Sequence, residues 1–245
     1  MSTILLPATG HHRPPAAAAS TRRPDDGASP PLVPRLLAEF IGTFFLVFTV
    51  CAAVNPKTGA GPLAPLAIGS VLMAMVFAGG HVSGGHYNPA VSLAVMIRGK
   101  LAISEWLAYT IAQLGAGAVG GLVASGLVGR GHPVATGSTG KILTVEFLFT
   151  FALAYVVLNV TTARTNEGNS YFGLAIGFTV AAGGLAAGAI SGGAFNPAVA
   201  FGVSLAGILR WSAIWIYLIA SVTGGGLAAF AFLSVQSAEK PDART

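Results

Sequence analysis

This chain has few charged residues and a single cysteine. Charged side chains make up 9% of its 245 residues, and hydrophobic residues make up 53%. Soluble domains carry roughly 25% charged residues, so we expect a membrane protein whose charges lie outside the bilayer. The single cysteine, Cys51, excludes an intrachain disulfide. A net charge of only +5 does not suggest a nucleic-acid partner, and basic loops on one side of a membrane account for it better.

The sequence also lacks the residue patterns of catalysis and of metal binding. It contains no nucleophile–base constellation and no phosphate-cradling loop, so we expect neither an enzyme nor a cofactor. His81 and His86 have no acidic or cysteine partner at ligand spacing, so we expect no metal site.

The two ends of the chain differ in composition from the rest. Residues 1–33 are rich in proline and alanine, and residues 236–245 are mostly polar, so we expect both to be disordered cytoplasmic tails. Residues 1–33 lack the apolar core of a secretory signal. An organelle transit peptide is the alternative, although Asp25 and Asp26 are unusual in one.

Six apolar stretches between the tails are long enough to span a bilayer. Two shorter apolar runs, at 88–97 and 196–206, measure about 15 Å as helices, half of the ~30 Å hydrocarbon core. The sequence therefore predicts an all-α membrane protein with six transmembrane helices and two re-entrant half-helices. The six spans are expected at 35–54, 63–82, 103–128, 141–161, 171–190 and 212–235.

The tripeptide Asn-Pro-Ala occurs at the start of each short run, both times in the frame Ser-Gly-Gly-x-x-Asn-Pro-Ala-Val. Asparagine is a preferred helix N-cap, and proline is preferred at the first helical position. Each copy therefore predicts a helix start, and the repetition in so apolar a chain suggests a channel. The predicted motif residues are Asn88, Pro89, Ala90, Asn196, Pro197 and Ala198.

The motif belongs to a longer internal repeat. Asn88 and Asn196 are 108 residues apart (196 − 88), and Glu39 and Glu146 are 107 apart (146 − 39). We expect one channel domain at 34–235, with repeats at 34–130 and 141–235. Each repeat has three full spans, an odd number, so the second must be inverted relative to the first. The two half-helices then enter from opposite faces and meet near mid-membrane.

Such a meeting point has a defined electrostatic character. The first N–H groups of a helix have no intrahelical partner, and the helix dipole adds partial positive charge there. Two such ends in one pore repel cations. The Ser-Gly-Gly segments are extended backbone, which survives at membrane depth only when it is buried in protein or lines a water-filled cavity.

Residues 83–91 closely resemble the signature of the aquaporin and aquaglyceroporin family (major intrinsic proteins), and the resemblance covers about residues 34–235. It implies a passive channel for water and small uncharged solutes, a pore in each protomer and a homotetramer in the lipid bilayer. It makes Asn88 and Asn196 the central donors. It implies an acceptor ladder formed by the carbonyls of Gly84, Gly85, His86, Gly192, Gly193 and Ala194.

The resemblance also implies a four-residue selectivity filter at Ile68, Gly184, Gly193 and Val199. Many water-selective members have an aromatic residue, a His, a small residue and an Arg there. Val199 stands where the Arg is usual, so we expect a wide, apolar filter. Glycerol-conducting members typically carry an Asp shortly after the second motif, which residues 200–202 lack. Glycerol, urea, ammonia and hydrogen peroxide are the candidate solutes beyond water.

Glu39 and Glu146 are ionisable groups inside apolar spans, where the default hypothesis is a functional one. A proton-coupled secondary transporter would use them as a relay. In the family that this chain resembles, the matching acids hydrogen-bond the backbone leading into the half-helices, and we favour this structural role. A membrane protein with a closed pore and a structural role is a third possibility.

The basic residues indicate the orientation. With the N-terminus inside, most Lys and Arg residues lie on the inner side, so we expect cytoplasmic N- and C-termini, in the plasma membrane. Small residues four apart predict close helix packing. These pairs are Gly117 and Gly121, Gly173 and Gly177, and Gly184 and Gly188.

Overall fold

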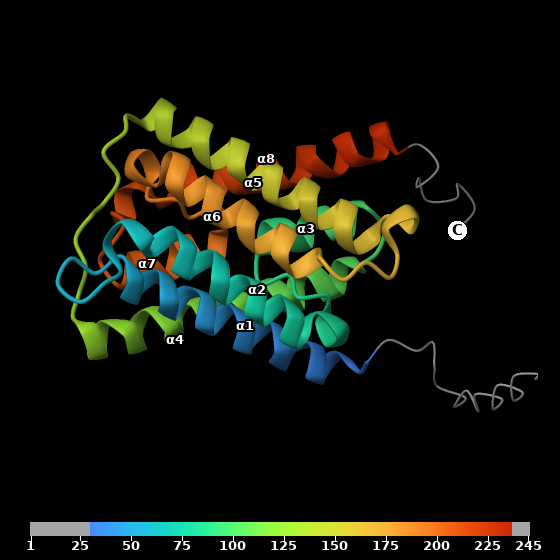
Figure 1. Cartoon of the computed structure of the whole chain (residues 1–245), viewed down its shortest axis with the longest axis horizontal. Coiled ribbons are helices and arrows are strands. Elements are labelled where there is room, and N and C mark those ends of the chain that lie inside the picture. The colour runs from blue at the N-terminus through green and yellow to red at the C-terminus, as the bar shows by residue number, and fades with distance from the viewer. Residues whose placement is uncertain (1–29, 237–245) are drawn as a thin grey trace, which may run out of the picture.

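The computed structural model describes residues 30–236, and every regular element in this range is a helix (Figure 1). Six long helices are α1 (Leu32–Ala53), α2 (Ala64–Ser83), α4 (Ile103–Val128), α5 (Thr139–Thr162), α6 (Phe172–Ser191) and α8 (Ile214–Val235). Two short ones are α3 (Pro89–Ile97) and α7 (Pro197–Leu205). Three single 3₁₀ turns are η1 (Gly61–Leu63), η2 (Arg164–Asn166) and η3 (Trp211–Ala213). The predicted fold class is confirmed.

The boundaries differ from the predicted ones by a few residues at most. Helix α1 begins at Leu32, so residues 32 and 33 of the expected tail are helical. Pro34 is compatible with this start because the first-turn N–H groups have no intrahelical partner. Residues 1–29 and 237–245 lie outside the described part of the chain, and the tail predictions made for them stay predictions.

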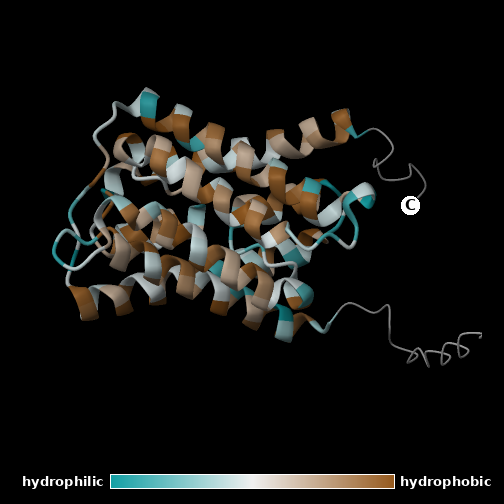
Figure 2. Cartoon of the chain, in the orientation of Figure 1, coloured by the Kyte–Doolittle hydropathy of each residue, from teal (hydrophilic) through white to brown (hydrophobic). Residues whose placement is uncertain are grey.

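The outer faces of the helices are apolar. Figure 2 shows brown, apolar residues along the helices, with most of the teal ones at the two ends and in the loops. Large aliphatic side chains on these faces are exposed, such as Val33 (74%), Ile111 (72%) and Leu127 (72%). So extensive an exposed apolar surface is unfavourable in water and is stable against the hydrocarbon chains of lipid. Within residues 30–236, six helices are long and apolar enough to cross a membrane.

The two halves run in opposite directions and interlock. In Figure 1 the start of α1 and the end of α8 lie at one end of the bundle, and the loop 129–138 lies at the other. Helix α3 packs against α8 and α5, and α7 packs against α4 and α1. Each half-helix is therefore enclosed partly by helices of the other half.

Glycines permit this interlocking. A Cβ atom on Gly117 of α4 would lie 2.5 Å from the carbonyl oxygen of Ala198, and one on Gly225 of α8 would lie 2.5 Å from that of Ala90. The helix backbones therefore touch the half-helices directly. The predicted close packing is confirmed at Gly117, and also at Gly121 and Gly177, where an added Cβ would clash with carbonyl oxygens of other helices. It is wrong at Gly188, where an added Cβ would meet no atom within 4 Å.

Candidate pore

Both half-helices begin at their asparagine. The side-chain oxygen of Asn88 accepts a hydrogen bond from the Ala90 N–H at 2.9 Å. That of Asn196 accepts from the Ala198 N–H at 2.9 Å and from the Val199 N–H at 3.4 Å. The first helical residue of each is the motif proline. Each asparagine thus satisfies part of the donor set that a helix start leaves open.

The same asparagines connect the two repeats. The Asn88 side-chain amide donates to the carbonyl of Phe195 at 3.0 Å, and the Asn196 amide donates to that of Tyr87 at 2.8 Å. Both asparagines are buried. The positive ends of the two half-helix dipoles therefore face each other at the centre of the bundle.

Glu39 fixes the backbone that leads into α3. One carboxylate oxygen accepts hydrogen bonds from the Ser83 hydroxyl at 2.7 Å and the His86 N–H at 2.9 Å. The other accepts from the Tyr87 N–H at 2.6 Å and the Gln113 amide at 2.8 Å. The Glu39 side chain is fully buried.

Glu146 does the same for α7. It accepts from the Ser191 hydroxyl at 2.6 Å, from the Ala194 N–H at 3.0 Å and from the Phe195 N–H at 2.6 Å. It is likewise fully buried and is not among the residues that line the two cavities described below. Both acids are thus engaged with the backbone of the segments that precede the asparagines.

The residue before each asparagine adopts an uncommon backbone conformation, which the sequence did not indicate. Tyr87 has φ 49° and Phe195 has φ 48°, in the left-handed region that bulky residues rarely enter. Their N–H groups are the ones at 2.6 Å from Glu39 and Glu146. These short hydrogen bonds help to retain the conformation, which turns the Tyr87 and Phe195 carbonyls toward the asparagines.

Two tyrosines that sequence reasoning also missed support the same segments. The Tyr109 hydroxyl donates to the Ser83 carbonyl at 2.8 Å, and the Tyr217 hydroxyl donates to the Ser191 carbonyl at 2.5 Å. The internal repeat could have pointed to this pair, because the two tyrosines are 108 residues apart (217 − 109), the same spacing as that of the two motif asparagines.

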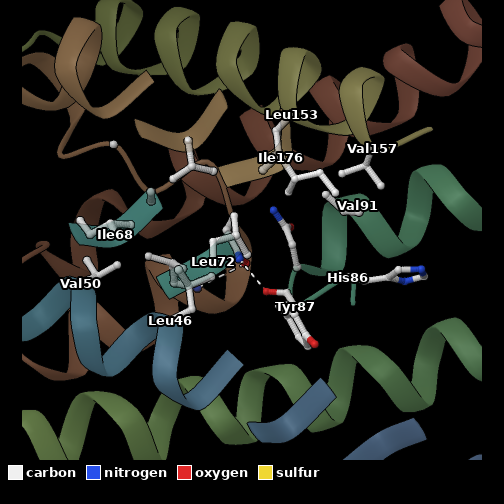
Figure 3. Close-up of a pocket in the computed structure, with 16 residues that line it drawn as sticks. Leu46, Val50, Ile68, Leu72, His86, Tyr87, Val91, Leu153, Val157 and Ile176 are labelled. Atoms are coloured by element: carbon white, nitrogen blue, oxygen red, sulfur yellow. Dashed lines mark hydrogen bonds between the residues drawn. The ribbon is translucent and has the colours of Figure 1, made fainter. Parts of the chain in front are cut away.

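A narrow cavity of about 20 Å³ lies around the two asparagines (Figure 3). A single water needs roughly 10–15 Å³ on this measure, so the lumen has room for one or two. Most of its lining is aliphatic. The lining residues are Leu46, Val50, Ile68, Leu72, His86, Tyr87, Asn88, Val91, Leu153, Val157, Ile176, Val180, Gly193, Ala194, Asn196 and Val199.

Three of the four predicted filter residues, Ile68, Gly193 and Val199, line this lumen together. The sequence predicted a wide filter, whereas the lumen that these residues line is narrow. The fourth, Gly184, is not among the lining residues, and a Cβ there would meet Pro65 at 2.9 Å. Of the predicted ladder, His86, Gly193 and Ala194 line the lumen. The aliphatic residues of the spanning helices were missed because no motif marks them.

A wider cavity of about 590 Å³ adjoins the lumen, and we call it the vestibule. Gly84 and His86 line it, and His86 lines both cavities. Arg35 also lines the vestibule; it forms an ion pair with Glu105 and donates a hydrogen bond to Tyr109 at 2.9 Å. Across residues 30–236, no group of three or more His, Cys, Asp or Glu side chains is placed to hold a metal ion.

Six spanning helices that enclose two asparagine-capped half-helices around a narrow lumen define a membrane channel with an inverted repeat. The family model of the major intrinsic proteins matches residues 28–232. The chain belongs to the major intrinsic protein family, whose members are aquaporin-type channels.

Curated plant relatives agree with this assignment. Aquaporin NIP1-1 of Zea mays is 35% identical over 87% of this chain and 78% of its own length. Aquaporin NIP1-3 of Oryza sativa subsp. japonica is 37% identical over 84% and 75%. Nodulin-26 of Glycine max is 32% identical over 89% and 83%.

A solved structure supports the fold. The aquaglyceroporin from Plasmodium falciparum superposes with a TM-score of 0.73 at 20% sequence identity. The match covers 85% of this chain and 99% of that one.

Proposed function

We propose that this protein is a passive channel for water and small uncharged solutes. The observation that carries the proposal is the pair of half-helix N-termini that meet in the lumen, each capped by an asparagine that donates to the other repeat. Two positive dipole ends repel cations at mid-pore. Neutral molecules pass them without an electrostatic penalty.

The route of a solute follows from the groups that face the lumen. The N–H groups of His86, Tyr87, Ala194 and Phe195 donate to the two buried glutamates. Their hydrogen bonds support an arrangement in which the carbonyls of the Ser-Gly-Gly segments serve as acceptors for the passing solute. The carbonyls of Gly84, Gly85, His86, Gly192, Gly193 and Ala194 then form the ladder.

We assign the filter to Ile68, Gly184, Gly193 and Val199, with Val199 in place of the usual Arg. Without a fixed cation the constriction is apolar, which favours neutral solutes beyond water. Glycerol, urea, ammonia and hydrogen peroxide are the candidates. The names of the relatives, aquaporins and an aquaglyceroporin, are consistent with water and glycerol.

A proton-coupled transporter that uses Glu39 or Glu146 is the rival function. A relay acid needs contact with a proton pathway, whereas both carboxylates are fully buried and hydrogen-bonded to backbone and side chains. These contacts favour the structural role of the two acids.

We further infer a homotetramer in the plasma membrane, with both termini cytoplasmic. The excess of basic residues that favours this orientation comes from the sequence of the two end segments, which hold Arg13, Arg22, Arg23, Lys240 and Arg244. The basic residues of the described part divide evenly. Arg35, Arg98, Lys100 and Arg164 lie toward the end where α1 begins, and Lys57, Arg130, Lys141 and Arg210 lie toward the other.

Stopped-flow swelling of proteoliposomes with water and a panel of neutral solutes tests the proposal. A channel gives flux with a low activation energy and no dependence on a proton gradient. Uptake that requires a proton gradient favours the transporter. Flux equal to that of protein-free liposomes, with folded protein present, refutes the channel.

A further inference from the structure

The lining of the lumen follows the internal repeat almost residue for residue. Residues 107 or 108 apart occupy matching places, as Leu46 and Leu153 do (153 − 46 = 107) and Val91 and Val199 do (199 − 91 = 108). The departures are the pair His86 and Ala194, which differ in chemistry, and the residues Tyr87 and Gly193, whose counterparts Phe195 and Gly85 do not line the lumen. A lining with this symmetry has two equivalent apolar zones, one on each side of the asparagines.

We call the first zone the outer ring: Leu46 and Val50 of α1, Ile68 of α2 and Val199 of α7. Helix α7 packs against α1, so Val199 belongs with the α1 residues. In Figure 3, Leu46, Val50 and Ile68 lie together on one side of the lumen.

We call the second zone the inner ring: Leu153 and Val157 of α5, Ile176 of α6 and Val91 of α3. Helix α3 packs against α5, as α7 packs against α1. Figure 3 shows these four residues grouped on the side toward His86. Val91 is 1% exposed and Val199 is 3% exposed. Both valines are therefore buried.

An aliphatic ring in a narrow lumen opposes the passage of water. A water molecule beside such side chains has partners only on the wall that carries the proposed ladder, to which His86, Gly193 and Ala194 belong. It therefore loses some of its hydrogen bonds, and narrow apolar constrictions in channels impede flow by dewetting. The ring side chains carry neither donors nor acceptors. Between the rings, each asparagine amide donates one N–H to the Phe195 or Tyr87 carbonyl and keeps a second N–H for a passing water.

On the basis of the proposed channel function, we propose that Val91 is a second selectivity-determining residue, equivalent to Val199, and that the pore has two apolar barriers in series. The asparagines separate the two barriers. Because Val199 stands where an Arg is usual, the outer ring consists of aliphatic side chains, as the inner ring does.

Barriers in series make a quantitative prediction. Resistances in series add, so the removal of one of two equal barriers raises the flux at most about twofold, and the removal of both raises it further. The test compares Val91→Thr, Val199→Thr and the double variant of the full chain in proteoliposomes by stopped-flow water permeability. Thr has nearly the shape of Val and adds a hydroxyl that can bond to a passing water.

We expect each single variant to raise water permeability by a similar factor, up to about twofold, and the double variant to exceed the product of the two. Val203→Thr is the matched control, because Val203 lies one turn beyond Val199 on α7, is 3% exposed and is not among the residues that line the lumen. It should leave the permeability unchanged. Val91→Ala and Val199→Ala serve as a second set if a Thr variant does not fold.

An increase that comes from Val199 alone, with Val91 without effect, would overturn the two-barrier proposal and leave the channel function intact. Permeability unchanged in all folded variants would overturn it as well. Wild-type flux equal to that of protein-free liposomes would refute the channel function itself, so the two failures are distinct.

Discussion

Glu39 and Glu146 accept different numbers of hydrogen bonds although they occupy matching places in the two halves. Glu39 accepts one more, from the Gln113 amide. The counterpart of Gln113 in the second half is Ser221 (113 + 108), whose hydroxyl accepts from Thr150 at 3.4 Å. The support of the two half-helices is therefore unequal.

Glu39→Gln should destabilise the protein more than Glu146→Gln. Each change replaces one carboxylate oxygen, an acceptor, by an NH2 group that faces other donors, and it removes the charge. Hydrogen bonds to a charged group contribute about 1.5–3 kcal/mol each to stability. Thermal unfolding in detergent measures the difference. If Glu39→Gln unfolds at the wild-type temperature, the structural role is excluded for this acid, and proton-coupled uptake should then be measured.

Asn196→Asp should increase cation leakage. An aspartate retains the oxygen that caps α7, but it cannot donate to the Tyr87 carbonyl, and it adds a negative charge where two positive dipole ends meet. Ionic current in planar bilayers measures the leak. Asn88→Asp, at the matching place, should act in the same direction; wild-type current in both folded variants would contradict the central role of the pair.

The half-helices depend on the glycines of the helices beside them. Gly117→Ala should destabilise the protein by about 1–3 kcal/mol, the usual effect of overpacking, because the new Cβ meets the Ala198 carbonyl. Gly126 of the same helix has no atom within 4 Å of an added Cβ, so Gly126→Ala is the control and should be neutral or stabilising. Thermal unfolding compares the two; equal effects would contradict the close contact.

The sequence predicted these helices better than it predicted their rotation. The spans and both half-helix starts followed from apolar length and from Asn-Pro-Ala. The aliphatic lining did not, because Leu46 and Val50 face the lumen whereas Ile41 and Phe45 of the same helix are exposed on the outside. Both faces are apolar, so hydropathy does not distinguish them. The left-handed Tyr87 and Phe195 carry no signal of their own, since bulky residues rarely adopt that conformation.

The molecule as a whole combines a wide vestibule, whose lining includes charged side chains such as Arg35 and Lys100, with a narrow lumen lined mostly by aliphatic side chains. The vestibule of about 590 Å³ admits hydrated solutes, and the lumen of about 20 Å³ requires them to shed most of their water. The loss of hydration water at an apolar ring costs an ion a large free energy, because an isolated charge in a low-dielectric medium is strongly disfavoured.

Wild-type protein in planar bilayers should therefore carry no potassium, chloride or proton current above that of protein-free membranes, while water flux in liposomes is readily measured. The two measurements use the same preparation, and the water flux demonstrates that the protein is open. A steady ionic current in the absence of any substitution would contradict the barrier formed by the rings and the two helix ends.

The hydrogen bond from Asn88 to the Phe195 carbonyl has a consequence for biosynthesis, because donor and acceptor are 107 residues apart. At a translation rate of about 5–20 residues per second, the acceptor leaves the ribosome roughly 5–20 s after the donor. During that interval α3 also lacks α8, against which it packs. An unpaired polar side chain such as the Asn88 amide is disfavoured in lipid, and so is the non-helical backbone of residues 84–88. The nascent α3 therefore has to wait outside the hydrocarbon core or beside the insertion machinery until the second half has been made.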